Sequence, residues 1–267
     1  MLLNMPEGPE VKIMSGYINR VSEGIVYSSV YVERKKNFPL IDIEEYTLSS
    51  KTRGKEMRLK LKNASKRIYL RINLGMSGCF KMYKNIKDTP AGTAISFIHS
   101  EGVLAFVDVR RFARCTKDRN WGEKRGPCVL DEYHEFKKNL RDNMDRRIFD
   151  KEIYLLILNQ TYFNGIGNYL RAEIIYRWGF SPYMSSREAV MDDDFVRLCH
   201  KVTKKAYKLG GAELYTWQTP DGFAKNQRKW DKFMKCYKKP GMKSIEGPKD
   251  RKFWYSPGHL TPIKQRK

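Results

Sequence analysis

The chain has 267 residues, and its basic side chains outnumber its acidic ones by 52 − 30 = 22 charges. Hydrophobic residues make up 41% of it, enough for the core of one large domain or two ordinary ones, and no apolar run approaches the ~20 residues that cross a bilayer. An excess of positive charge this large suits a polyanionic partner, although a merely soluble basic surface is the alternative on charge alone.

The first half of the chain predicts one helix followed by strands. Residues 9–24 carry apolar side chains at helical spacing, and Gly24 ends the pattern. Between residues 25 and 109, short runs alternate apolar and charged residues, as in Met57, Leu59 and Leu61. Such runs, separated by turns, indicate an antiparallel sandwich or barrel.

The pattern becomes helical after a linker expected at residues 127–148. We expect Asp150 to cap a helix, the turn at residues 164–167 to break it, and a second helix to run from Asn168. Further helices are expected at 193–208 and 221–237. The Lys-, Gly- and Pro-rich tail has one short strand candidate at residues 252–255.

The predicted fold is therefore α+β with two domains. An N-terminal helix and β-sandwich fill residues 5–130, a helical domain fills residues 131–237, and residues 238–267 form a basic terminal element. The five cysteines are odd in number and widely spaced, and no CxxC pair occurs. This usage favours a reducing compartment and indicates no disulfide framework or four-cysteine zinc site.

The stretch MPEGPE at residues 5–10 carries a chemical hypothesis beside an ordinary one. The ordinary interpretation is a Pro- and Glu-rich lead into a helix. If Met1–Met5 are absent from the mature chain, Pro6 has a free secondary amine, whose pKa near ~8 leaves a sizeable neutral fraction at physiological pH. A neutral amine can attack a sugar carbon and form an iminium, and Glu7 beside it can move protons.

Five stretches, in order, resemble the formamidopyrimidine-DNA glycosylase / endonuclease VIII family. They are MPEGPE at 5–10, RGKE at 53–56, NLGMSG at 73–78, DVRRF at 108–112 and FNGIGNYLRAE at 163–173. Together they reach across most of the chain. The sequence RGPCVL at 125–130 and the missing CxxC pairs resemble the animal endonuclease VIII-like members whose β-hairpin finger has no zinc.

The resemblance implies a catalytic set of Pro6, Glu7 and Lys55. Pro6 would attack C1′ of the damaged nucleotide, Glu7 would protonate the sugar ring oxygen, and Lys55 would contact phosphate. Lys55 has separate support, because it shares the inward phase of Met57 and Leu59 and a core-facing lysine needs a partner. A lysine that snorkels from a strand end is the alternative.

The resemblance also implies DNA contacts. Asn168, at a helix start, would bind phosphate, although an ordinary N-cap is the alternative. Met76, Arg110 and Phe112 would fill the space that a flipped nucleotide leaves, whereas the residues alone suggest core positions for Met76 and Phe112. Three further DNA or lesion-pocket contacts are expected at Tyr169, Glu10 and Ala212.

The resemblance to the animal members with a zincless finger implies a lysine that touches the flipped base where this chain has Ala212. The loss of that cationic donor leaves the substrate preference open. Arg251 would grip phosphate from a zincless finger. A disordered basic tail is the alternative, although the aromatic residues 253–255 argue against it. The helical domain would contain a helix–two-turn–helix.

The predicted function is a bifunctional DNA glycosylase and abasic-site lyase of base excision repair, with no metal or cofactor. Its partner would be duplex or single-stranded DNA with oxidised bases or abasic sites, and other repair proteins are conceivable partners. A monomer in the nucleus is expected, with mitochondria as the alternative location and no membrane contact. The rivals are a catalytically silent binder of damaged or single-stranded DNA and, more remotely, an RNA-binding protein.

Overall fold

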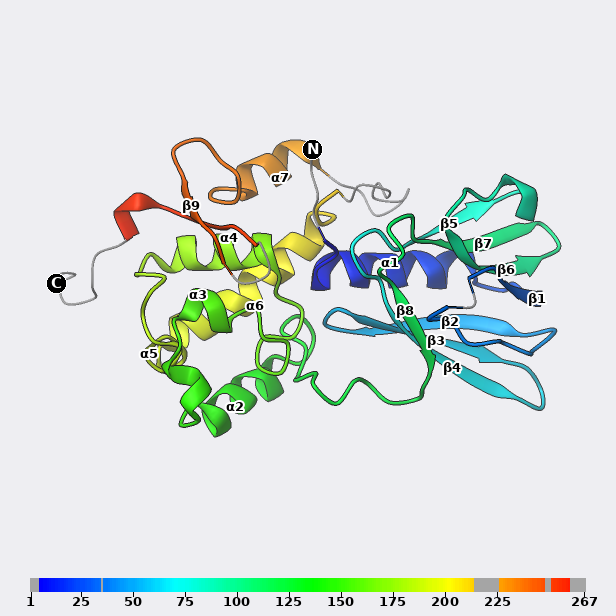
Figure 1. Ribbon diagram of the computed structural model, residues 1–267, viewed down its shortest axis with the longest axis horizontal. Helices are drawn as coiled ribbons and strands as arrows, with labels where there is room; N and C mark the ends of the chain where they lie inside the picture. The colour runs from blue at the N-terminus through cyan, green and yellow to red at the C-terminus, as the bar shows by residue number, and fades with distance from the viewer. Residues whose placement is uncertain (1–4, 35, 214–225, 248–250, 260–267) are drawn as a thin grey trace. The chain divides into compact units, whose positions relative to one another are not determined.

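The computed structural model describes residues 5–34, 36–213, 226–247 and 251–259, which fall into two compact units (Figure 1). The described part of the first unit comprises residues 5–6, 10–34, 36–122 and 212–213. That of the second comprises residues 7–9, 123–211, 226–247 and 251–259. The expected terminal element is not a unit of its own, and the first unit's main segment ends at Gly122 rather than at residue 130.

The first unit is built on two four-stranded antiparallel sheets, in strand orders β1-β6-β7-β5 and β2-β3-β4-β8. The strands are β1 (Tyr27–Val32), β2 (Thr47–Arg53), β3 (Glu56–Lys62), β4 (Arg67–Asn73), β5 (Cys79–Tyr83), β6 (Thr93–His99), β7 (Gly102–Val107) and β8 (Arg114–Lys117). A short 3-10 helix, η1 (Ile86–Asp88), follows β5.

Apolar alternation determines which face of β3 and of β4 is buried. Met57 and Leu59 of β3 lie opposite Ile72 and Leu70 of β4, and all four side chains have no exposed surface. Aromatic rings fill the other sheet, where those of Phe80 and Phe106 lie 4.8 Å apart. The predicted antiparallel β domain is confirmed, as a sandwich of two sheets.

Helix α1 (Gly8–Val21) bonds to an edge strand of each sheet. The Ser15 hydroxyl donates to the Ser50 hydroxyl of β2 at 2.8 Å, and the Met82 amide of β5 donates to the Tyr17 hydroxyl at 3.2 Å. Asn19 adds two bonds to the Ser50 backbone. The helix thereby satisfies polar groups at strand edges that would otherwise be open to pairing.

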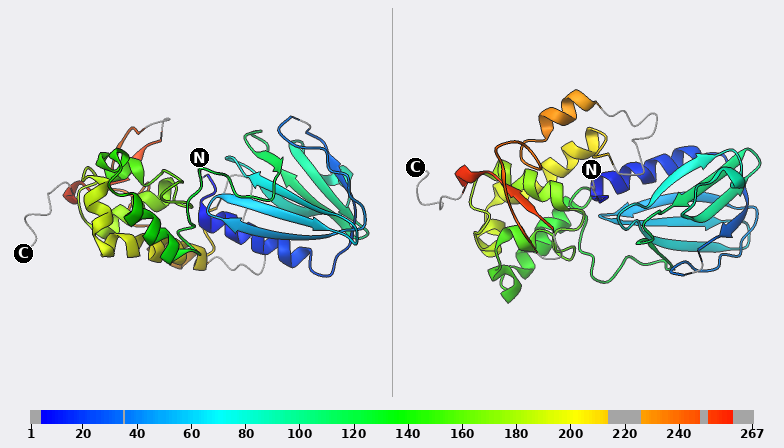
Figure 2. Two further views of the ribbon diagram at one scale, coloured as in Figure 1. Left: turned by 90° about the horizontal axis from the view of Figure 1, so that it is seen from below. Right: turned by 45° about the horizontal axis from the view of Figure 1, so that its top comes forward.

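The second unit is mainly helical (Figure 2). Its helices are α2 (Tyr133–Asn143), α3 (Ile153–Leu156), α4 (Asn168–Trp178), α5 (Ser186–Met191), α6 (Asp193–Lys208) and α7 (Gln227–Phe233), with 3-10 helices η2 (Arg147–Asp150) and η4 (Pro257–His259). The strands β9 (Lys243–Ile245) and β10 (Phe253–Tyr255) pair as an antiparallel hairpin.

Three expectations for this unit are corrected. The expected linker at 127–148 contains α2, which buries Phe136 and Leu140. The N-cap of α3 is Glu152, because Asp150 ends η2 instead. The helix expected at 221–237 is α7, which ends at Phe233, and residues 221–225 lie outside the described ranges. In those ranges no helix is long and apolar enough to cross a membrane.

Candidate active site

The carboxylate of Glu7 bonds to the start of helix α4. Its oxygens accept the backbone N–H groups of Gly167 at 2.7 Å, Tyr169 at 2.9 Å and Leu170 at 3.3 Å. The N-terminus of a helix exposes unpaired N–H donors and the positive end of the dipole, so it stabilises an anion there. Glu7 is 3% exposed, and its neighbour Pro6 is also buried.

Glycines make room for the Glu7 side chain beside the start of α4. A Cβ on Gly167 would lie 2.3 Å from the Glu7 carboxyl carbon, so a larger residue would displace the glutamate. Gly8 donates to the Gly165 carbonyl at 2.8 Å, and a Cβ on Gly8 would lie 3.1 Å from the Gly165 Cα. The MPEGPE and FNGIGN stretches therefore meet through glycine backbone, and this meeting fixes the residue that follows Pro6.

Lys55 lies in the two-residue turn between β2 and β3, next to Gly54. Its side chain is half-buried. β3 starts at Glu56, so Lys55 lies in the turn that precedes the strand rather than in the strand itself. The turn presents the lysine at the end of a hairpin, which is a suitable place for a phosphate contact.

Met76, Arg110 and Phe112 lie on two loops that touch each other. Gly75 (φ +61°) packs so closely on the second loop that a Cβ there would lie 2.7 Å from the Phe112 carbonyl carbon. Phe112 is 54% exposed, and the Arg110 guanidinium lies 5.1 Å from its ring centroid. The structure thus brings the three predicted residues to neighbouring loops and exposes Arg110 and Phe112, so the core position for Phe112 is wrong.

Asp108 holds the two loops together. One carboxylate oxygen accepts the Ser77 hydroxyl at 2.6 Å, and the other accepts the Ala113 amide at 2.8 Å and pairs with Arg34 at 3.0 Å. Ser77 in turn accepts the amide of Arg110 at 3.1 Å. Asp108 has no exposed surface. Its charge therefore serves internal bonds and sets the position of the exposed loop residues.

Asn168 is the first residue of α4, and Gly167 is the N-cap. Its side-chain amide donates to the Lys252 carbonyl at 3.0 Å, and its oxygen accepts a bond from Arg171. Asn168 therefore contacts the backbone beside Arg251, so the structure brings these two predicted phosphate-binding residues together. Arg251 is partly exposed, and its carbonyl accepts the Gly247 amide at 3.1 Å, which closes the hairpin.

Arg171 joins helix α4 to the hairpin from inside. It has no exposed surface, it donates to the Tyr154 carbonyl at 2.9 Å, and its guanidinium carbon lies 4.8 Å from the Phe253 ring centroid. Burial lowers the pKa of Arg171 to about 10. The charge of Glu7 acts in the opposite direction and raises this pKa, whereas the charge of Arg251 lowers it further. The group stays charged at neutral pH, so a buried cation supports the hairpin.

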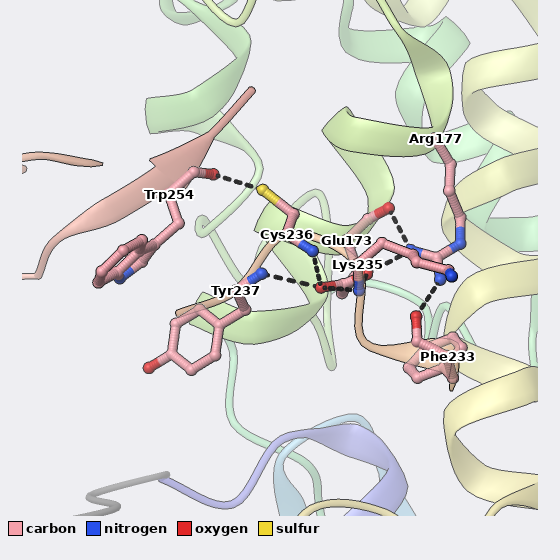
Figure 3. A network of polar contacts seen from close by, with 7 residues as sticks. All are labelled: Glu173, Arg177, Phe233, Lys235, Cys236, Tyr237 and Trp254. Carbon is pink, nitrogen blue, oxygen red and sulfur yellow. Dashed lines mark hydrogen bonds and ion pairs between the residues drawn. The ribbon is translucent and has the colours of Figure 1, made fainter. Parts of the chain in front are cut away.

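Glu173 anchors the chain that leads to the hairpin (Figure 3). Its fully buried carboxylate accepts the backbone amides of Lys235, Cys236 and Tyr237 at 2.8–3.1 Å, and it pairs with Arg177 at 2.5 Å. The Cys236 thiol donates to the Trp254 carbonyl of β10 at 3.3 Å. A buried charge is tolerated here because each of its oxygens has donors.

The proposed lesion-pocket residues Glu10 and Ala212 are direct partners. The Ala212 amide donates to a Glu10 carboxylate oxygen at 2.7 Å, and both residues are buried. The residues that follow, 214–225, lie outside the described part of the chain. Tyr169 is 1% exposed, and its ring packs against that of Trp230. A ligand would therefore meet the backbone of Tyr169 and not its ring.

The cysteines of this chain are free and buried, so none is suited to thiolate chemistry. Burial raises the pKa of Cys115 and of Cys236 to about 12 in each case, and that of Cys199 also rises. Within the described ranges, no cluster of three or more His, Cys, Asp or Glu side chains could hold a metal ion.

Sequence reasoning missed the roles of Asp108, Arg171 and Glu173. All three lie inside stretches that were recognised, but no role was assigned to them. A signal existed in residues 168–178, where Arg171 and Glu173 stand among apolar neighbours that must be buried. Charged residues in such a helix need partners, although the sequence does not say which.

Comparisons with known proteins identify the relatives of this chain. The family model for the formamidopyrimidine-DNA glycosylase N-terminal domain matches residues 5–115. Human endonuclease 8-like 1 is 33% identical over 296 residues, covering 97% of this chain and 74% of the relative. The mouse protein of the same name is 32% identical, covering 97% of this chain and 75% of the relative.

Solved structures show the same fold. The MutM (Fpg) protein of Thermus thermophilus superposes with a TM-score of 0.77 at 20% identity, covering 96% of this chain and 99% of that one. The Lactococcus lactis Fpg in complex with abasic-site DNA gives a TM-score of 0.74 at 20% identity, covering 94% and 98%.

The chain belongs to the formamidopyrimidine-DNA glycosylase family. Within it, the chain is similar over nearly its whole length to the mammalian endonuclease 8-like 1 proteins. It is a DNA glycosylase of the family's two-domain type, and the resemblance predicted from its sequence is confirmed.

Proposed function

We propose that this protein is a bifunctional glycosylase and abasic-site lyase, acting as a monomer on DNA with oxidised pyrimidines or ring-opened purines. The observation that carries the proposal is the set of three bonds from the start of α4 to Glu7. They fix the residue next to Pro6 in a buried position on the helix–two-turn–helix. A nucleophile beside it is thereby held in place for attack, which is how positioning accelerates a reaction.

The reaction begins with the amine of Pro6 in a chain that starts there. The carboxylate of Glu7 accepts one proton of the ammonium, and the neutral amine bonds to C1′ as the bond to the damaged base breaks. The proton that remains on the proline nitrogen passes to the departing base. Glu7 returns the proton to the ring oxygen, the sugar opens, and an iminium links Pro6 to C1′. Loss of the C2′ proton expels the 3′ phosphate, a second elimination expels the 5′ phosphate, and water releases proline.

The DNA contacts support the same proposal. Lys55 in its turn, Asn168 at the helix start and Arg251 in the hairpin would bind phosphates, and Met76, Arg110 and Phe112 would replace the flipped nucleotide. Glu10 and Ala212 would line the lesion pocket, where Ala212 supplies no cation to the base. We therefore expect a substrate ranking unlike that of a relative with lysine there.

We further propose that the hairpin is a finger that works without zinc, and that the protein acts in the nucleus or in mitochondria. Arg171 and Phe253 support the hairpin from inside the protein. The five buried free thiols suit a reducing compartment.

Elemental analysis of the purified protein tests the zinc-free finger, and imaging of a C-terminally tagged chain tests the location. Stoichiometric zinc, or a secreted protein, would contradict them.

The test of the mechanism is borohydride trapping. Protein whose first residue is Pro6 should form a reduced covalent adduct with abasic-site DNA, because an iminium is reducible. The matched control is the same chain with residues 1–5 retained, whose Pro6 nitrogen is an amide, and it should form none. DNA binding without an adduct from the Pro6 form would favour the catalytically silent binder. Equal trapping by both forms would place the nucleophile elsewhere.

A further inference from the structure

A pocket of about 580 Å³ lies among helices α4, α6 and α7 of the second unit. Apolar side chains form its floor, and exposed lysines form most of its rim. The floor residues are Leu198, Val202 and Phe233. The basic residues are Arg177, Lys201, Lys205, Lys229 and Lys232. None of these residues belongs to the site proposed above.

Helical spacing places the lysines in two facing pairs. Lys201 and Lys205 are four residues apart on α6, and Lys229 and Lys232 are three apart on α7, so each pair shares one helix face. The orange helix α7 and the yellow helix α6 are neighbours in Figure 2. Like charges at these spacings repel each other and destabilise a helix slightly.

Carboxylates of the described residues balance little of the pocket's positive charge. Arg177 is already neutralised, because it pairs with Glu173 at 2.5 Å and donates to the Phe233 carbonyl (Figure 3). For the four lysines, no carboxylate of the described residues lies within ion-pair distance. An anionic ligand would therefore remove a repulsion that the free protein retains.

We propose that this pocket binds an acidic peptide segment of a partner protein, with one apolar side chain seated on the floor and carboxylates against the lysines. The pairing of an apolar anchor with a charged rim is the usual anatomy of protein recognition. A nucleic-acid backbone supplies the charge but nothing for Leu198 and Val202 to contact. One face of the Phe233 ring is already covered by the Arg177 guanidinium, 4.7 Å from its centroid, which disfavours base stacking.

The test measures peptide binding and DNA binding on the same variants. The probe is a short fluorescein-labelled peptide with Leu-Phe at its centre and only Asp and Glu elsewhere, followed by anisotropy. The pocket variant is Lys201→Glu with Lys205→Glu. The matched control is Lys204→Glu with Lys208→Glu, which makes the same charge change at exposed positions of α6 outside the pocket.

The pocket variant should bind the peptide at least about tenfold more weakly than the control variant, since reversed rim charges oppose the carboxylates. Leu198→Ser, or serine in place of Leu-Phe in the peptide, should also weaken binding. The pocket variant and the control variant should bind abasic-site DNA equally well, and both should still be trapped by borohydride. Absence of peptide binding by the unmodified protein, or equal loss in both pairs, would overturn the proposal. A selective loss of DNA binding by the pocket variant would assign the lysines to the DNA path instead.

Discussion

At the residue scale, buried acids determine where the exposed functional groups stand. Glu7 binds the start of α4, Asp108 binds two loops, and Glu173 binds the segment before the hairpin. Each accepts backbone or hydroxyl hydrogens, so its charge is compensated without exposure to solvent. The exposed Arg110 and Phe112, in contrast, make few internal contacts and are available to a ligand.

Replacement of Glu7 by glutamine should separate base release from lyase chemistry. The amide cannot pass a proton to the sugar, so release of an oxidised base should fall by about 10²–10⁴-fold. Trapping on DNA that already has an abasic site should fall less, because the base is gone. Single-turnover assays on the two substrates measure both steps. Unchanged base release would assign the acid to another residue.

Removal of the Phe112 ring should impair work on duplex DNA in particular. Because the side chain is 54% exposed, Phe112→Ala should change the unfolding free energy by within about 0.5 kcal/mol. Excision from duplex should drop roughly tenfold, since the ring that offsets part of the lost stacking is gone, whereas excision from single strands should hardly change. Val109→Ala, on the same loop and 41% exposed, is the control. Equal losses on both substrates would refute a role in base flipping.

At the scale of elements, a two-stranded hairpin of three residues per strand is too small to be stable alone. The β9–β10 hairpin depends on its neighbours: Phe253 is fully buried, stacks on Tyr154 at 5.2 Å and lies under Arg171. Asn168 binds its backbone from the start of α4. The element that carries Arg251 is therefore supported by residues of α3 and α4.

Loss of the Arg171 guanidinium should loosen this hairpin. Arg171→Met keeps the aliphatic stem but leaves the Tyr154 carbonyl and the Asn168 side-chain oxygen without that donor, at about 1–3 kcal/mol for each buried group. We expect a lower Tm, faster proteolysis near residues 243–255 and weaker DNA binding. Arg197→Met, at a 55% exposed position of α6, should show none of these. Proteolysis at the unmodified rate would mean that the aromatic contacts suffice.

At the scale of the whole molecule, the excess of 22 positive charges determines the strength of DNA binding more than its selectivity. Those charges have different roles. Arg171 and Arg177 are bonded within the protein, Arg251 is partly exposed in the hairpin, and Lys201 and Lys205 belong to a separate pocket. Net charge alone therefore overestimates the number of phosphate contacts.

The salt dependence of DNA binding tests this distribution. Each phosphate that is neutralised contributes about −0.9 to the slope of log K against log salt. Arg251→Ala should reduce the slope's magnitude by about one and weaken binding to undamaged and damaged duplex alike. Lys138→Ala, at a 74% exposed position of α2, is the control and should leave the slope unchanged. A loss restricted to one lesion would indicate a base contact by Arg251.

The sequence by itself determined the family, the change from a β-rich first unit to a mainly helical second one, and the list of candidate site residues. Alternation identified β3 and β4, and helical spacing gave the bounds of α6, because these patterns depend only on local geometry. It failed at the linker, where the apolar residues of α2 were too few to signal a helix, and at Lys55, which lies in a turn rather than in a strand.

Only the tertiary structure decided which groups are partners. Glu7 lies 160 residues before Gly167 along the chain, and Asn168 lies 84 residues before Lys252, yet each pair is hydrogen-bonded. No local pattern encodes such pairs, because a hydrogen bond depends on position in space and not on separation in sequence. For the same reason, the roles of Asp108, Arg171 and the lysine-rimmed pocket came from the folded chain alone.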